Sequence, residues 1–210
     1  MTEIINEIER IAKLKKSDIG PTEENVKQKV IVPILELLGH KRENLEFEYR
    51  TRSGGKIDVY IKNDVPSDCK VMIDTKNYNE DLNSYVEQIK NYTIDEGALL
   101  AVIANGTEIR IYCHLRGVTL ERSLLYSIKR QNINKESNWR ILTDLLHNNN
   151  LQNRNVLKKI DEREREIKNA MLNEENIRQE YEDKVEGIDG DIKIKEEEIE
   201  KLKREREKFK

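Results

Sequence analysis

Apolar residues near the start of the chain recur at intervals of three and four, the spacing of one helical face. This pattern predicts an amphipathic helix over residues 3–16. A second helix is expected over 22–38, because Thr22 is a suitable N-cap and Gly39 is a suitable stop. Pro33 falls inside this second helix and predicts a kink there.

The middle of the chain has the pattern of a mixed sheet. Runs of β-branched and aromatic residues bounded by turn residues predict five strands, over 45–50, 56–62, 70–74, 99–104 and 108–113. Residues 81–93 have helical spacing, and Asn105-Gly106 predicts a hairpin. A further helix is predicted over 119–148. This order of elements predicts an α/β fold with helices on both sides of the sheet.

The pattern changes to a seven-residue repeat after residue 150. The apolar members of the repeat are Leu157, Ile160, Ile167, Met171, Tyr181, Val185, Ile188, Ile192, Ile199, Leu202 and Phe209. We therefore expect a domain over 1–150 and a helical coiled-coil tail over 151–210 that pairs chains into a homo-oligomer, most simply a dimer. Gly187 and Gly190 leave open the alternative of a helical hairpin at 185–191.

Composition narrows the classes of function. Of the 210 residues, 38% are charged and 36% are hydrophobic, which suits a globular part with an extended, solvated part. The net charge of -3 gives no general attraction to nucleic acid, so any DNA-binding surface must be local. Two cysteines and three histidines have no metal-ligand spacing, and no apolar run approaches a membrane span. A reduced, cytoplasmic protein without a membrane partner is expected.

The candidate chemistry lies in two of the predicted strands. Asp58 lies in one, and Asp74 and Lys76 lie two positions apart at the end of the next. Alternation along a strand places positions 74 and 76 on the same face. Two carboxylates and an ammonium at one sheet edge suit a Mg²⁺-dependent attack of water on phosphate. Lys27, Arg50 and Arg52 could contact phosphate, although scattered basic residues usually lie on the surface.

Residues 20–114 resemble the PD-(D/E)XK nucleases, and most closely the N-terminal nuclease domain of type I restriction enzyme restriction subunits. The matching stretches, in order, are 22–29, Ile57-Asp58-Val-Tyr, Ile73-Asp74-Thr-Lys76, Glu87-Gln88-Ile-Lys-Asn-Tyr92 and 103–112. The family often has glutamate where Asp74 stands. The chain also has no phosphate loop with the Gly-x-x-x-x-Gly-Lys-Ser/Thr pattern, so the ATP-driven motor of those subunits is not expected in it.

The resemblance implies a restriction-endonuclease-like fold and a DNA endonuclease, acting in restriction or phage defence. Asp58, Asp74 and the carbonyl of Thr75 would bind Mg²⁺, with Mn²⁺ as a substitute, and Lys76 would act on water or phosphate. Glu24 would contact a metal-bound water, with Glu23 as the alternative. Gln88 and Tyr92 would support the site or contact DNA, and separate restriction-system subunits are further candidate partners.

Two other functions are compatible with the same residues. The first is a non-catalytic nuclease-like module that recruits a partner through its coiled coil. The second is an RNA nuclease, since the same chemistry cleaves either nucleic acid.

Overall fold

The computed structural model describes residues 2–113 and 123–207. The chain forms an α/β fold with two compact units, Met1–Arg163 and Glu164–Lys210. Residues 119–122 of the predicted helix and Phe209 of the predicted repeat lie outside the described residues.

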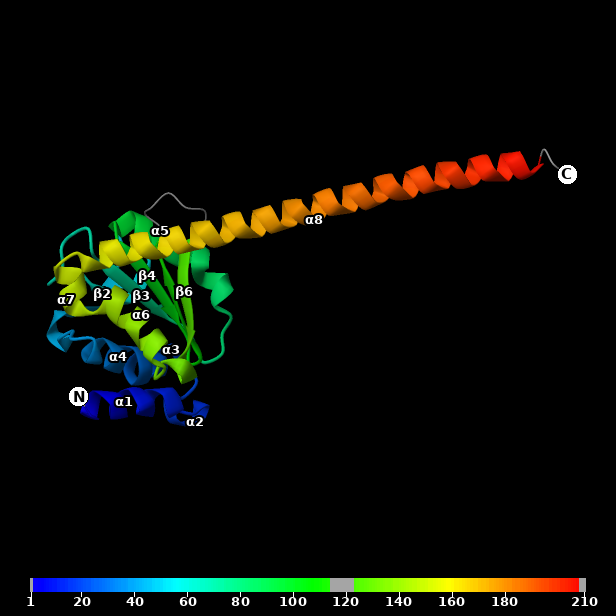
Figure 1. The fold of residues 1–210 in the computed structure, drawn as a ribbon. Helices are drawn as coiled ribbons and strands as arrows, with labels where there is room; N and C mark the ends of the chain where they lie inside the picture. The colour runs from blue at the N-terminus through cyan, green and yellow to red at the C-terminus, as the bar shows by residue number, and fades with distance from the viewer. Residues whose placement is uncertain (1, 114–122, 208–210) are drawn as a thin grey trace. The chain divides into compact units, whose positions relative to one another are not determined.

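A six-stranded mixed sheet forms the centre of the first unit, in the order β1-β2-β3-β4-β5-β6 (Figure 1). Its strands are β1 Leu45–Arg50, β2 Lys56–Ile61, β3 Val71–Thr75, β4 Leu100–Ala104, β5 Glu108–Tyr112 and β6 Leu124–Lys129. Only the β3–β4 pair is parallel, and every other neighbouring pair is antiparallel. A parallel pair needs a crossover connection, which η3 Leu82–Tyr85 and α5 Val86–Glu96 supply.

Helices cover both faces of the sheet. The helices before the sheet are α1 Thr2–Lys13, α2 Lys16–Ile19, α3 Glu23–Val26, the π-helical η1 Lys27–Ile31 and α4 Val32–Leu37. Figure 1 shows the sheet between α5 on one side and α3 and α4 on the other. Every residue of β3 and β4 is buried, as expected for central strands covered on both faces.

The expected hairpin after β4 is present and is held by the Asn105 side chain. Its Oδ1 accepts hydrogen bonds from the main-chain N–H groups of Thr107 and Glu108, both at 2.8 Å. An asparagine that bonds its own backbone in this way favours a tight turn. β5 therefore returns antiparallel to β4.

The prediction of helix over 119–148 is wrong for residues 124–129. They form β6, which pairs antiparallel with β5 and adds a sixth strand. Leu125 and Ile128 are the buried residues of this segment, and β5 offers a free edge with which it can pair. Helix begins only after η5 Arg130–Asn132, with α6 Glu136–Leu146 and then α7 Asn148–Gln152.

A buried arginine ties the N-terminal helix to the end of β6. The Arg130 guanidinium donates to the carbonyls of Ile11 at 2.5 Å, Ala12 at 2.9 Å and Leu14 at 2.6 Å. It also donates to the Gly106 carbonyl at 2.7 Å. Three of these acceptors lie at the C-terminus of α1, where carbonyls lack helical partners and a cation is favourable.

The tail is one continuous helix, α8 Asn155–Glu207, and residues 185–191 are helical throughout. The hairpin alternative at 185–191 is therefore wrong. The first unit also extends to Arg163, beyond the predicted boundary at 150, and Val156 and Ile160 at the start of α8 are fully buried. Among the described helices, none is long and apolar enough to cross a membrane.

Candidate functional site

The candidate site lies where β2 and β3 separate. Their antiparallel register runs from Ile61–Val71 to Val59–Ile73, and the next residues on the two strands are Asp58 and Asp74. Beyond this point the main chain of β3 bonds to a side chain of β2. The Thr75 N–H donates to Asp58 Oδ2 at 2.7 Å, and the Thr75 hydroxyl donates to the same oxygen.

Asp74 and Lys76 form a buried ion pair at the end of β3. The Lys76 Nζ lies 2.8 Å from Asp74 Oδ2, and the two side chains are 9% and 8% exposed. The pKa of Asp74 is raised to about 6, chiefly by burial; Lys76 acts to lower it, and the charges of Asp58 and Glu23 act to raise it. The structure thus pairs Asp74 with Lys76, and the charge of Asp58 influences the pKa of both.

Lys76 has a second contact that the sequence analysis did not include. Its Nζ lies 4.2 Å from the centre of the Tyr85 ring, and the Tyr85 hydroxyl donates to Glu80. Burial acts to lower the pKa of the Lys76 ammonium, but attraction and hydrogen bonding to Asp74 together outweigh it and raise the pKa. Lys76 is therefore a charged donor held between a carboxylate and an aromatic face.

The two glutamates of α3 have different surroundings. Glu23 is half-buried, and its charge raises the pKa of both Asp74 and Lys76. Glu24 is exposed and pairs with Lys27 at 2.6 Å. Glu23 is therefore the α3 carboxylate that acts on the Asp74–Lys76 pair, whereas Glu24 is linked to Asp58 through Lys27.

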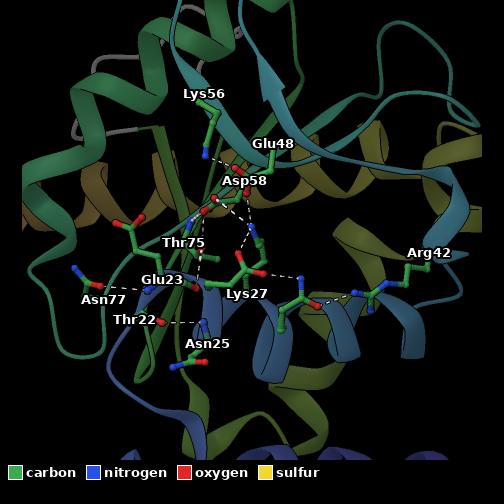
Figure 2. A network of polar contacts seen from close by, with 12 residues as sticks. Thr22, Glu23, Asn25, Lys27, Arg42, Glu48, Lys56, Asp58, Thr75 and Asn77 are labelled. Carbon is green, nitrogen blue, oxygen red and sulfur yellow. Dashed lines mark hydrogen bonds and ion pairs between the residues drawn. The ribbon is translucent and has the colours of Figure 1, made fainter.

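Lys27 is a buried residue of this site, against the expectation that it lies on the surface. Its side chain is 3% exposed and lies near three carboxylates: Glu24, Glu48 and, at 3.8 Å, Asp58 (Figure 2). Burial acts to lower the pKa of Lys27, and these carboxylates raise it above its ordinary value. The sequence offers one sign of this pairing: Lys27 follows Glu24 by three residues, a spacing that places the two side chains together on a helix.

Glu48 was also missed by the sequence analysis. It lies in β1 between the register pairs Phe47–Val59 and Tyr49–Ile57, and therefore opposite Asp58. Its φ of 56° is in the left-handed region, which non-glycine residues rarely adopt. Its carboxylate pairs with Lys27 and Lys56, and their hydrogen bonds lower its pKa (Figure 2). No local pattern in the sequence marks this backbone conformation.

Gln88 and Tyr92 lie on α5 and contact each other. The Gln88 Nε2 donates to the Tyr92 hydroxyl at 2.9 Å. The Tyr92 ring packs against Gly55 in the turn between β1 and β2, so closely that a Cβ at Gly55 would lie 2.2 Å from it. This packing supports the hairpin that carries Asp58; the described polar contacts of the pair do not include Asp58, Asp74 or Lys76.

The fit to a divalent cation rests on two carboxylates. Asp58 and Asp74 follow the last register pair of β2 and β3 and are buried, and the charge of Asp58 helps to raise the pKa of Asp74. A cation bound between them would relieve this repulsion. In the described part of the chain, no group of three or more His, Cys, Asp or Glu residues is arranged to hold a metal. Mg²⁺ suits such a site because it keeps several waters and uses one or two carboxylates.

The arrangement therefore offers two buried carboxylates and a fixed ammonium at the point where β2 and β3 separate. It can hold a hard cation, and it can donate a charged hydrogen bond to an anionic oxygen. In comparisons with known proteins, no family model, no curated protein and no solved structure matches this chain.

Proposed function

We propose that this protein is a Mg²⁺-dependent DNA endonuclease with a restriction-endonuclease-like fold, similar to the nuclease domain of type I restriction subunits. One observation carries the proposal: Asp74 and Lys76 form a buried ion pair, 2.8 Å apart, where β2 and β3 separate, and Asp58 is the next residue of β2 at that point. The ordered motifs of residues 20–114 support the same function. Restriction or phage defence is the role that the resemblance suggests.

Each residue has a distinct role in the proposed reaction. Asp58 and Asp74 would hold Mg²⁺, together with the main-chain carbonyl of Thr75, and Mn²⁺ would substitute. The bound ion would supply an activated water and neutralise charge on the phosphate. Thr75 fixes the Asp58 carboxylate through two hydrogen bonds. The protonated Lys76 orients the nucleophile or stabilises the charge that develops on the phosphate oxygens.

The proposal is tested by incubating the full chain with plasmid DNA, with and without Mg²⁺ or Mn²⁺. We expect Lys76→Ala and Asp58→Asn to lower metal-dependent cleavage by about 10²-fold or more, the range for removing one preorganised group. Lys158→Ala is the matched control, because the Lys158 side chain is 79% exposed. Structured RNA as a parallel substrate separates a ribonuclease from a deoxyribonuclease. Equal cleavage by wild type and Lys76→Ala contradicts the assignment.

A second candidate is a non-catalytic module with the same fold. This candidate is favoured because both carboxylates already have partners within the protein and do not need a metal ion to satisfy them. Asp58 accepts two hydrogen bonds from Thr75, and Asp74 is paired with Lys76. Thermal melting with and without Mg²⁺ or Mn²⁺ separates the candidates, because a ligand that binds only the folded state raises the melting temperature. A rise that disappears in Asp58→Asn supports the nuclease, and no rise in wild type supports the module.

A further inference from the structure

The second unit of the chain exposes apolar side chains along a helix that has no core of its own. Met171, Ile177, Tyr181, Val185 and Ile188 are 37%, 55%, 67%, 56% and 59% exposed. Their unit, Glu164–Lys210, contains the later turns of α8 up to Glu207. A helix with an exposed apolar stripe marks a surface for association.

We propose that residues 167–185 of α8 pair with the same segment of a second copy in an antiparallel coiled coil. The two-fold axis passes near residue 176, so residues at equal distances before and after it meet in one layer. This interaction surface goes beyond the proposed nuclease function and does not depend on it. The occupant is a second copy because the segment is complementary to itself in the antiparallel direction.

The apolar layers of the proposed pair are self-complementary. Ile167 meets Val185 of the second copy, and Met171 meets Tyr181 of the second copy. A two-fold axis repeats each contact with the roles exchanged, so these residues form four layers. Each layer joins two apolar side chains from alternate positions of the seven-residue repeat, as packing in a coiled coil requires.

Two charged residues in the apolar stripe decide the direction. Glu174 and Arg178 lie at the two innermost positions of the repeat, on either side of residue 176. In an antiparallel pair, Glu174 meets Arg178 of the second copy in both central layers. In a parallel pair in register, Glu174 would meet Glu174 and Arg178 would meet Arg178. Like charges in successive core layers disfavour that direction.

The positions beside the stripe agree with the same direction. Ile177 flanks the axis and meets Ile177 of the second copy, whereas a parallel pair would place it against Glu182. Lys168 faces Glu182 of the second copy in the antiparallel pair, an attractive contact. Charge at these flanking positions commonly sets the orientation of coiled coils. Glu175 meets Glu175 of the second copy, and this repulsion is the one unfavourable flanking contact near the axis.

Disulfide trapping in the full chain tests both the pairing and its direction. We expect Ile177→Cys to give a covalent dimer under mild oxidation, because the two copies of this position are adjacent across the axis. Val185→Cys is the matched control: it gives a covalent dimer only in a parallel pair, where it meets itself. The native Cys69 and Cys113 are fully buried, so wild type should give no covalent dimer.

Sedimentation of charge variants provides an independent measurement. Arg178→Glu places two carboxylates in each central layer and should shift the dimer towards monomer, and Glu174→Arg in the same chain should restore the dimer. Trapping through Val185→Cys and not Ile177→Cys overturns the antiparallel direction. A wild-type chain that sediments as a monomer, or that associates only with a different protein, overturns pairing with a second copy.

Discussion

Lys76 is held from two sides, by the Asp74 carboxylate and the Tyr85 ring. A cation over an aromatic face gains about 0.5–2 kcal/mol, depending on its desolvation. We therefore expect Tyr85→Leu to slow metal-dependent cleavage by roughly 2- to 30-fold. Tyr85→Phe keeps the ring and loses only the hydroxyl bond to Glu80, so it should retain most of the activity.

The measurement for Tyr85 is the initial rate of plasmid cleavage at saturating Mg²⁺, with thermal melting to verify folding. Equal loss of activity in Tyr85→Phe and Tyr85→Leu would contradict a role for the aromatic face. Tyr85 would then act through the hydroxyl and Glu80.

His40 makes the stability of the first unit depend on pH. Its Nε2 lies 2.7 Å from the Leu146 carbonyl, and in the described part of the chain its buried Nδ1 has no hydrogen-bond partner. Burial lowers the pKa of His40 from its ordinary 6.5. Below that pH the unfolded chain takes up a proton that the folded chain resists. The contribution to stability is therefore present above pH 6.5 and is lost as the pH falls.

We expect His40→Gln to flatten this pH dependence, because an amide N–H can still donate to the Leu146 carbonyl without titrating. One proton changes the free energy of unfolding by at most about 1.4 kcal/mol per pH unit. Urea unfolding of wild type and variant between about pH 7 and 5 measures the difference, around the ordinary histidine pKa. If the free energy of unfolding changed equally with pH in wild type and His40→Gln, His40 would have the same pKa in the folded and unfolded chains, and the prediction would be wrong.

At the scale of elements, the hydrophobic pattern predicted five strands and the β4–β5 hairpin, and the sixth strand was predicted as helix. Ile128 and Leu125 are buried in β6. Short apolar runs suit either a strand or a helix, and local periodicity does not separate them. The free edge of β5 decided the outcome, because it offers hydrogen bonds that only an extended segment can complete.

The continuity of α8 through Gly187 leads to a prediction about this helix. Glycine inside a helix costs about 1 kcal/mol relative to alanine, and a Cβ at Gly187 would meet no atom within 4 Å. Gly187→Ala should therefore stabilise the helix by about that amount. The measurement is helicity by circular dichroism, together with the rate of proteolysis near residue 187.

Gly97→Ala is the control for Gly187→Ala, because the same substitution is expected to destabilise the protein at this position. Gly97 ends α5 with a φ of 63°, in the left-handed region where alanine is disfavoured. This variant should lower the melting temperature of the first unit, although it too meets no atom within 4 Å. Stabilisation by both substitutions would show that backbone conformation is not the cause.

At the scale of the whole molecule, the boundary between the units determines which shortened chains fold. Leu151, Val156 and Ile160 follow the predicted boundary at 150 and are fully buried. Burying one large aliphatic side chain contributes about 1.5–3 kcal/mol. A chain ending after Arg163 should melt like the first unit of the full chain, and one ending after Asn150 should be destabilised by several kcal/mol. Scanning calorimetry of the two chains makes the comparison, and equal melting temperatures would restore the boundary at 150.

The local pattern of the sequence by itself determined most of the secondary structure, the change to a long helix and the placement of Asp74 and Lys76 side by side at a strand end. These features depend on nearest neighbours: periodicity, caps, and the alternation that places 74 and 76 on one face. Only the tertiary structure decided that residues 124–129 form a strand, that Lys27 is buried and that Glu23 acts on Asp74 and Lys76. It also showed Glu48 opposite Asp58 and Tyr85 against Lys76. Those outcomes depend on partners distant in sequence, whose positions exist only once the sheet and its helices have packed.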